Sequence, residues 1–218
     1  MLLSYISGLT ISYLIGGIPF GYFIAITKGI DIRQHGSGNI GASNVGRILG
    51  RKYGIIIFIL DLLKGFVSVS VIPIWVSKLQ FPTNSGDLLV ILCGLCAILG
   101  HVFPVYLRFK GGKGVATSFG VFIWLVPVSA IISFSIWIVI VLIFRYVSLG
   151  SMIASLAITG SIIVLENDPF GTGIYLTVLS AAVAMLIIMR HWVNIQRIIS
   201  GTESKIMSKG DYTESKGF

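Results

Sequence analysis

Long apolar stretches separated by short polar segments run through the whole chain. A helix that crosses a bilayer needs about 20 mainly apolar residues, with a range of about 17–25. Five stretches meet or approach this length, the fourth of them short: Leu2–Thr27, Tyr53–Val76, Leu88–Leu107, Ser151–Leu165 and Gly173–Met189. The pattern predicts an all-α fold, a polytopic membrane helix bundle.

A sixth apolar stretch, Val115–Phe144, is too long for one comfortable crossing and contains Pro127 near its middle. It can form one long kinked helix or two short helices that turn at the proline. If the basic segment Lys28–Lys52 is cytoplasmic, the loop Ser77–Asp87 is external. Two crossings then leave the acidic loop Glu166–Gly171 outside and the basic C-terminal segment inside, as the positive-inside rule favours. We therefore predict seven transmembrane segments, two of them short, with the N-terminus outside and the C-terminus in the cytoplasm.

The composition excludes an ordinary soluble domain. The 218 residues are 55% hydrophobic and only 11% charged, whereas soluble domains have about a quarter charged residues. The predicted cytoplasmic segments are short, so any chemistry must take place in the membrane protein itself, at its inner surface. We expect one integral membrane domain over residues 1–207 and a flexible cytoplasmic tail over residues 208–218.

The first unusual polar segment, Ser37–Arg47, is rich in glycine and in small hydrogen-bond donors. Closely spaced glycines let backbone N–H groups converge on an anion, and an arginine can hold a phosphate through two hydrogen bonds. The alternative is an ordinary loop between helices. As an anion site, the segment would use Ser37, Gly38, Asn39, Gly41, Asn44 and Arg47.

The second segment places Lys113 between Gly112 and Gly114, just before an apolar helix whose free N–H groups favour an anion. It is not a Walker A motif, because Gly114 stands where that motif has Ser or Thr. Nucleotide hydrolysis is therefore not supported. The alternative is that Arg108, Lys110 and Lys113 only set topology or hold lipid headgroups.

The third segment begins at Arg190. If it is one helix, Arg190, Asn194 and Arg197 share a face, with His191 at its edge. An interfacial amphipathic helix would explain the arginines, but it gives no reason for Asn194 or for Glu203 further on.

Three residues elsewhere add to these segments. Ser148 lies in a short polar turn, where it can donate to a bound phosphate or be an ordinary turn serine. Asp61 and Lys64 stand three apart in an apolar helix. Ionised groups near the bilayer centre cost about 2.5–3.5 kcal/mol each. We therefore expect these two to pair and to brace the site from behind.

Together, the three polar segments resemble the acyl-phosphate:glycerol-3-phosphate acyltransferases of bacterial inner membranes. The matching motifs are Gly36-Ser-Gly-Asn-Ile-Gly-Ala-Ser-Asn44 with Arg47, Gly100-His-Val-Phe-Pro104 with Phe109-Lys-Gly-Gly-Lys-Gly-Val-Ala-Thr117, and His191 with Asn194, Arg197 and Gly201-Thr-Glu203. The resemblance spans nearly the whole chain. It implies transfer of a fatty acyl group from acyl phosphate to the 1-hydroxyl of glycerol 3-phosphate, giving lysophosphatidic acid and inorganic phosphate. The third motif departs from the family pattern, because apolar residues separate His191 from Asn194.

This reaction needs two anion-binding sites and a groove for an alkyl chain. Acyl phosphate has a good leaving group, and no Ser or Cys has an obvious activating partner, so we expect direct attack without an acyl-enzyme. Ser37, the Gly38–Gly41 backbone and Ser148 would line the acyl-phosphate pocket. Glycerol 3-phosphate would be held by Arg47, Lys113, Asn194 and Arg197. The catalytic candidates are Ser37, Lys113, His191 and Asn194. Of these, His191 is the candidate general base, and a phosphate oxygen of the acceptor is the alternative. Glu203 would orient Arg197 or Lys205.

Other readings fit the residues less well. None of the three histidines has the aspartate five residues later that soluble-lobe acyltransferases use as orienter. Transporters place polar residues at the midplane and have repeated halves, whereas here the polar groups gather at one interface. The paired-aspartate motif of the CDP-alcohol phosphotransferases is missing. We expect no metal ion, cofactor, nucleic acid or obligate protein partner, only the two substrates and membrane lipid.

Overall fold

The computed structural model describes residues 2–77 and 88–206. Within these ranges every regular element is a helix and no strand occurs, which confirms the predicted all-α fold. The predicted tail over residues 208–218 and most of the predicted external loop Ser77–Asp87 lie outside the described residues. The helices are α1 Leu2–Gly17, α2 Phe20–Ile26, η1 Ile32–Gln34, α3 Ala42–Leu49, α4 Arg51–Ser70, α5 Ile72–Ser77, α6 Leu88–Val102, η2 Val105–Leu107, α7 Val115–Leu125, α8 Pro127–Phe144, α9 Val147–Leu165, α10 Ile174–Arg190 and α11 Trp192–Ile199.

Several of these helices are suited to a bilayer. Five stretches of the described chain are long and apolar enough to cross it: Tyr5–Ile26, Arg51–Val76, Leu88–Leu107, Pro127–Phe144 and Val147–Leu165. The helices α10 and α11, which meet at 56°, form a sixth if they are taken together, and α7 is a shorter apolar helix. The predicted polytopic membrane fold is thus confirmed, while the count of seven segments and their orientation stay predictions.

The stretch Val115–Phe144 forms two helices, not one kinked helix. The first, α7, ends at Leu125, and α8 begins at Pro127. A proline at the first helical position is favourable, because its missing N–H group has no partner there and its φ angle suits the helix. The prediction that both helices are short is wrong for α8, which has 18 residues.

The helix predicted over Ser151–Leu165 is also longer than expected. It begins at Val147, so α9 has 19 residues. Its added first turn contains Ser148 and Gly150, which interrupt the apolar pattern in the sequence but are buried against the rest of the bundle. The same turn places Ser148 at the end of the bundle that carries α3 and α11.

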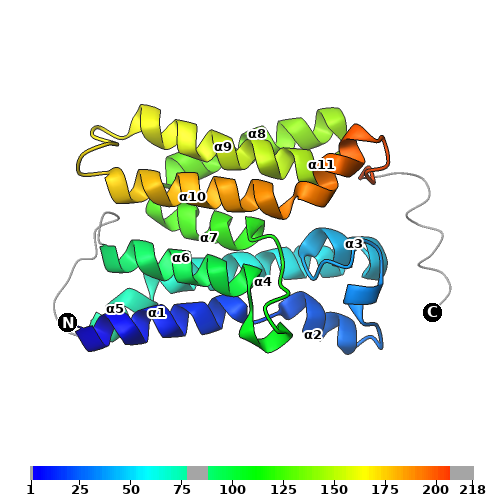
Figure 1. Cartoon of the computed structure of the whole chain (residues 1–218), viewed down its shortest axis with the longest axis horizontal. Coiled ribbons are helices and arrows are strands. Elements are labelled where there is room, and N and C mark those ends of the chain that lie inside the picture. The colour runs from blue at the N-terminus through cyan, green and yellow to red at the C-terminus, as the bar shows by residue number, and fades with distance from the viewer. Residues whose placement is uncertain (1, 78–87, 207–218) are drawn as a thin grey trace.

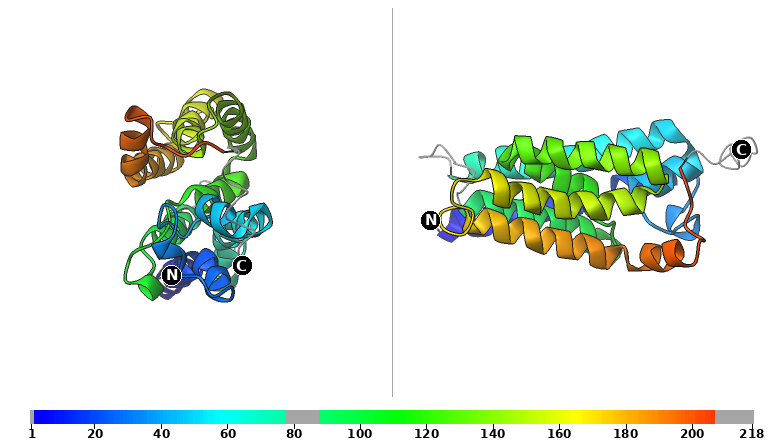
Figure 2. Two further views of the ribbon diagram at one scale, coloured as in Figure 1. Left: turned by 90° about the vertical axis from the view of Figure 1, so that its right-hand side faces the viewer. Right: turned by 90° about the horizontal axis from the view of Figure 1, so that it is seen from above.

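Most helices run parallel to the long axis of the molecule (Figure 1), and two groups of helices are visible end-on in the left view of Figure 2. One group holds α1 to α6 and the other α8 to α11, with α7 packed against both α4 and α8. The start of α1, α5 and the α9–α10 connection lie at one end. The helices α2, α3 and α11 lie at the other end, where the three polar segments of the sequence meet.

Close backbone contacts hold the first group together. A Cβ atom on Gly100 of α6 would lie 2.1 Å from the carbonyl oxygen of Tyr13 in α1, and one on Gly120 of α7 would lie 2.0 Å from that of Leu62 in α4. Small residues allow this approach between membrane helices, where packing replaces the hydrophobic effect as the main attraction. Because α6 packs closely on α1 and α7 packs closely on α4, both ends of the loop that joins α6 to α7 are held in place.

Candidate functional site

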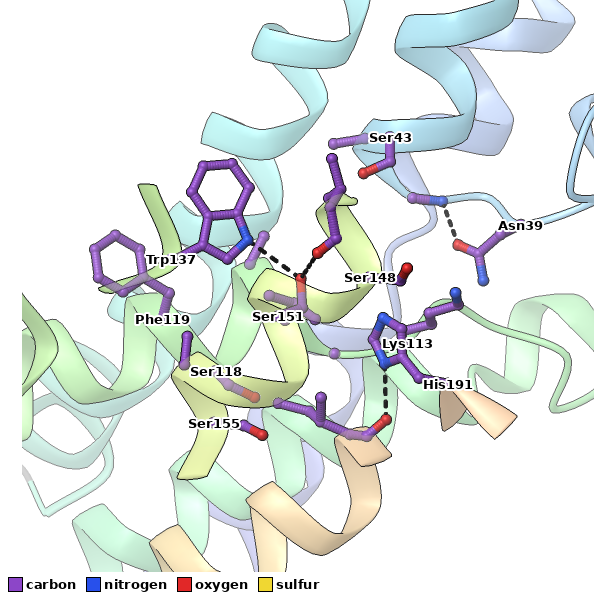
Figure 3. Close-up of a pocket in the computed structure, with 18 of the residues that line it drawn as sticks. Asn39, Ser43, Lys113, Ser118, Phe119, Trp137, Ser148, Ser151, Ser155 and His191 are labelled. Carbon is purple, nitrogen blue, oxygen red and sulfur yellow. Dashed lines mark hydrogen bonds between the residues drawn. The ribbon is translucent and has the colours of Figure 1, made fainter. Parts of the chain in front are cut away.

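A pocket of about 200 Å³ lies at the end of the bundle that carries α3 and α11. Its walls come from all three polar segments and from the first turn of α9. In Figure 3, Asn39, Lys113, Ser148 and His191 lie toward one end of the pocket. Of the fourteen site residues predicted from the sequence, only Gly38 and Gly112 do not line it; those that do are Ser37, Asn39, Gly41, Asn44, Arg47, Lys113, Gly114, Ser148, His191, Asn194, Arg197 and Glu203.

The side chain of Asn44 holds the first polar segment in shape. Its Oδ1 accepts from the Ser37 N–H at 2.9 Å, and its Nδ2 donates to the carbonyl oxygens of Asn39 at 2.9 Å and His35 at 3.1 Å. Only 3% of Asn44 is exposed. Its amide is therefore committed to the loop, which makes Asn44 a support for its neighbours even though it borders the pocket.

Three backbone N–H groups of this loop, those of Ser37, Gly38 and Gly41, are also engaged. The Ser37 N–H donates to Asn44, the Gly38 N–H to a preceding carbonyl oxygen at 3.0 Å, and the Gly41 N–H to Asn39 Oδ1 at 2.8 Å (Figure 3). Gly38 has φ +70°, a conformation that favours glycine. The expected phosphate contact with the Gly38–Gly41 backbone thus has less support than contacts from the side chains along the same loop.

The second segment is a tight loop that presents Lys113. The N–H groups of Gly111 and Gly112 donate to the last carbonyl oxygens of α6, at 3.2 and 3.1 Å. From the other side, Arg190 Nη2 donates to the carbonyl oxygens of Gly111 at 3.3 Å and Gly112 at 3.4 Å. Gly114, with φ +87°, then begins α7. The loop is fixed on both faces, so the Lys113 side chain leaves it from a defined point.

The surroundings of Lys113 lower the pKa of its ammonium group. Burial lowers the pKa of Lys113 to about 8, and the neighbouring guanidinium groups of Arg197, Arg190 and Arg47 act in the same direction. The carboxylate of Glu203 opposes them. Four cationic groups thus lie close together around a small volume, and Glu203 is the carboxylate that acts on Lys113, an arrangement suited to multiply charged anions.

Glu203 connects the second and third segments with α9. Its Oε1 accepts from Asn194 Nδ2 at 2.7 Å and from Ser148 Oγ at 2.5 Å. Because the amide group of Asn194 is turned toward Glu203, its Oδ1 is left to accept from the Lys113 ammonium. Glu203 therefore sets the orientation of Asn194 and, through it, the direction in which Lys113 points.

The expected partners of Glu203, Arg197 and Lys205, are not the ones observed. The chain leaves α11 through Gly201, which has φ +71°, and turns back so that the Glu203 N–H donates to the Arg197 carbonyl oxygen at 3.1 Å. After this turn, the carboxylate accepts from Ser148 on α9 and from Asn194 on α11. The Lys205 ammonium instead lies over the Tyr146 ring, 5.6 Å from its centre.

The third segment is not one continuous helix. The chain bends between α10 and α11 at His191, so Arg190 belongs to α10 and supports the glycine loop, while Asn194 and Arg197 line the pocket. His191 Nδ1 lies 2.8 Å from the Ile187 carbonyl oxygen (Figure 3). A carbonyl oxygen only accepts, so Nδ1 carries a proton, and in the neutral ring Nε2 then keeps its lone pair.

The residues that form the apolar part of the pocket were not among those predicted. Phe119, Phe134 and Trp137 form a stack, with centroid distances of 4.9 and 5.7 Å, and Trp137 Nε1 donates to Ser151 Oγ at 3.3 Å. Figure 3 shows Phe119 and Trp137 on the side away from Lys113. These residues lie within uniformly apolar helices, so nothing in the sequence pattern distinguishes them from lipid-facing neighbours.

In the described residues, no group of three or more His, Cys, Asp or Glu side chains could hold a metal ion. The residues described above give the pocket hydrogen-bond donors and positive charge at one end and an aromatic wall at the other. Such a site can orient phosphorylated molecules that carry an apolar chain and stabilise negative charge that develops on them.

Comparison with known proteins agrees with this arrangement. Residues 6–201 match the family model "Glycerol-3-phosphate acyltransferase". The glycerol-3-phosphate acyltransferases of Staphylococcus haemolyticus and Aquifex aeolicus are 45% and 42% identical to the chain, over 91% and 89% of it and 96% and 95% of their own lengths. A crystal structure of PlsY (YgiH), an integral membrane glycerol 3-phosphate acyltransferase in its glycerol 3-phosphate form, superposes with a TM-score of 0.83 at 40% identity and covers 93% of this chain and 95% of its own. The chain is thus a member of the glycerol-3-phosphate acyltransferase family of integral membrane proteins.

Proposed function

We propose that the protein transfers a fatty acyl group from acyl phosphate to the 1-hydroxyl of glycerol 3-phosphate, giving lysophosphatidic acid and inorganic phosphate. The observation that carries this proposal is one continuous pocket with Lys113, Arg47 and Arg197 at its polar end and Phe119 and Trp137 in its apolar wall. Both substrates carry a phosphate, and one also carries a long alkyl chain. Solved relatives in glycerol 3-phosphate and lysophosphatidic acid forms support this acceptor and this product.

Glycerol 3-phosphate is assigned to the cations around Lys113. Arg47 and Arg197 can each hold a phosphate oxygen pair, while Lys113, oriented by Asn194, supplies a further cation. The phosphate of the donor is assigned to the side chains of Ser37 and Asn39, with the alkyl chain along the aromatic wall. Ser148 borders the same pocket, but it can donate to this phosphate only when its hydroxyl leaves Glu203. Each buried methylene of that chain contributes about 0.8 kcal/mol.

In the proposed reaction, the 1-hydroxyl oxygen attacks the acyl carbonyl carbon, and the bond from that carbon to the phosphate oxygen breaks. The electron pair leaves with the phosphate, and the hydroxyl proton passes to His191 Nε2. Lys113 and its neighbouring guanidinium groups offset the charge of the two phosphates as they approach. No metal ion or cofactor is needed, because the donor is already an activated anhydride.

A covalent route through Ser148 is the main mechanistic alternative, because its hydroxyl donates to the carboxylate of Glu203. This route forms an acyl-Ser148 ester before glycerol 3-phosphate is bound. Purified protein incubated with acyl phosphate alone should show no added acyl mass in intact-protein mass spectrometry. An adduct that disappears on addition of glycerol 3-phosphate would replace direct attack with the covalent route.

The pocket is proposed to face the cytoplasm, with the protein in the bacterial inner membrane. The basic segment Lys28–Lys52, the loop around Lys113 and the α10–α11 bend all lie at the pocket end of the bundle. The positive-inside rule places such an end in the cytoplasm. Single cysteines introduced at Asn167 and Lys52 should react with an impermeant reagent from opposite sides of the membrane, and labelling from one side would contradict this orientation.

The donor is tested with purified protein in detergent and isotopically labelled glycerol 3-phosphate. Labelled lysophosphatidic acid should form with acyl phosphate and not with acyl-CoA or acyl carrier protein as the donor. Inorganic phosphate should be released in equal amount. Equal product from the thioester donors would overturn the proposed donor, and no product from any donor would overturn the proposed function.

A further inference from the structure

A buried polar cluster of Asp61, Lys64 and His101 lies beneath the glycine loop. Lys64 Nζ is 2.8 Å from Asp61 Oδ1, which confirms the predicted pairing, and His101 Nδ1 is 3.6 Å from the same oxygen. All three residues are at most 5% exposed. Asp61 and His101 line the pocket, whereas Lys64 turns away and donates to the Ile18 carbonyl oxygen at 3.0 Å. A cluster of ionisable groups in a membrane protein is costly to bury and usually serves the site it adjoins.

The imidazole ring of His101 lies directly against the glycine loop. A Cβ atom on Gly112 would be 2.1 Å from His101 Nε2, and the Gly112 N–H donates to the His101 carbonyl oxygen at 3.1 Å. Gly112 immediately precedes Lys113. The ring therefore fixes how far the loop can settle onto the end of α6, and with it the starting point of the Lys113 side chain.

The ring itself has a defined place because Asp61 stands on its other side. His101 Nδ1 has no hydrogen-bond partner within the described residues, and the carboxylate of Asp61 is the nearest opposite charge. Asp61 is in turn held by Lys64, which is anchored at the break between α1 and α2. Asp61 of α4 thus faces the ring from behind, itself held by Lys64, while the loop packs on the front of the ring.

We propose that His101, held by Asp61, is a positioning residue that sets the height of the glycine loop and so places the Lys113 ammonium for the phosphate of glycerol 3-phosphate. This inference rests on the proposed role of Lys113 in binding that substrate. His101 touches neither substrate in this scheme. Its removal lets the loop sink and moves the ammonium away from the phosphate, which weakens binding of glycerol 3-phosphate more than it slows the chemistry.

The test compares His101→Ala and Asp61→Asn with wild type and with Ile91→Ala, a control on the same helix that is equally buried and lies outside the pocket. The KM for glycerol 3-phosphate should rise about tenfold in both site variants, with kcat at saturation changed by about threefold at most. Calorimetric titration with glycerol 3-phosphate should give the same loss of affinity. If His101→Ala does not fold, His101→Asn takes its place with the same expected shift.

A second arm uses the steric contact itself. Gly112→Ala alone should weaken glycerol 3-phosphate binding, because the new methyl group meets the His101 ring. In the His101→Ala background, the same change should cost much less, since the ring is gone. Contacts that are independent of each other give additive effects. Additive losses in Gly112→Ala/His101→Ala would therefore overturn the inference.

The outcomes separate this inference from the proposed function. If wild type neither binds glycerol 3-phosphate nor forms product, the proposed function fails. If wild type is active and His101→Ala has the same KM for glycerol 3-phosphate as Ile91→Ala, the cluster is structural only and the inference fails. The inference fails in the same way if His101→Ala and Asp61→Asn lose thermal stability while this KM is unchanged.

Discussion

The two ends of the pocket are built in different ways. At the polar end, hydrogen bonds from Asn44, Arg190 and Glu203 fix three segments that are distant in the sequence. The apolar wall consists of helix side chains such as Phe119 and Trp137, which are held mainly by ring stacking, with one hydrogen bond from Trp137 to Ser151. A preorganised polar end can distinguish geometry and charge, while the apolar wall can accept chains of different lengths. Substitutions at the polar end should therefore change rate steeply, and those in the wall should change preference gently.

The largest effect is expected from Lys113→Ala. This change removes a desolvated cation from between Asn194 and the neighbouring arginines, and kcat/KM should fall by about 10²–10³-fold. Lys110→Ala is the matched control, because Lys110 is exposed on the same loop and outside the pocket. Initial rates of inorganic phosphate release measure both. Equal losses in the two variants would mean that the loop only contributes to the overall positive charge.

His191→Asn should have the next largest effect. If His191 Nε2 accepts the hydroxyl proton, kcat should fall by about 10²-fold while the KM for glycerol 3-phosphate changes little. Steady-state kinetics with both substrates varied separate the two constants. An unchanged kcat would transfer the role of proton acceptor to a phosphate oxygen of the acceptor. His35→Asn, at an exposed histidine outside the pocket, is the control.

The polar end could be largely anticipated from the sequence, and the reasons are physical. Clusters of glycine, asparagine and basic residues interrupt an otherwise apolar chain, so Asn39, Lys113 and Asn194 were identifiable as candidates. Their connections were not, because the bend at His191 and the turn at Gly201 depend on tertiary packing. The same holds for Glu203, whose partners lie on α9 and α11 and not beside it in the chain.

The residues of the apolar wall could not be identified from the sequence, because they do not differ from their neighbours. In the membrane-spanning helices, core and lipid-facing residues have the same composition, so hydrophobic periodicity fades and Trp137 cannot be told apart from Trp124. Only the structure shows that Trp137 lines the pocket whereas Trp124 makes an edge-to-face contact with Phe66. The length of α8 was misjudged for a related reason, since Pro127 marks the start of a helix as readily as a kink.

Lys113 at the polar end of the pocket should make activity depend on pH, whereas the apolar wall should not. Because the pKa of Lys113 is lowered to about 8, its ammonium is charged below that pH and is lost as the pH rises through it. The kcat/KM for glycerol 3-phosphate should therefore fall by up to about tenfold per pH unit above this value. Lys113→Arg keeps its charge at high pH and should flatten the decline. A decline that persists unchanged in Lys113→Arg would assign the titration to another group.

The smallest effect is expected from Trp137→Leu in the apolar wall. The change removes the ring that stacks on Phe134 and the bond to Ser151, but it leaves the polar end untouched. The preference among acyl phosphates of different chain lengths should shift by a few-fold, since each methylene contributes about 0.8 kcal/mol when buried, and the KM for glycerol 3-phosphate should stay constant. Trp124→Leu, outside the pocket, should leave the preference unchanged. If Trp137→Leu instead raised the KM for glycerol 3-phosphate with no change in chain preference, the two ends would be mechanically coupled and the division between a rigid polar end and a permissive wall would fail.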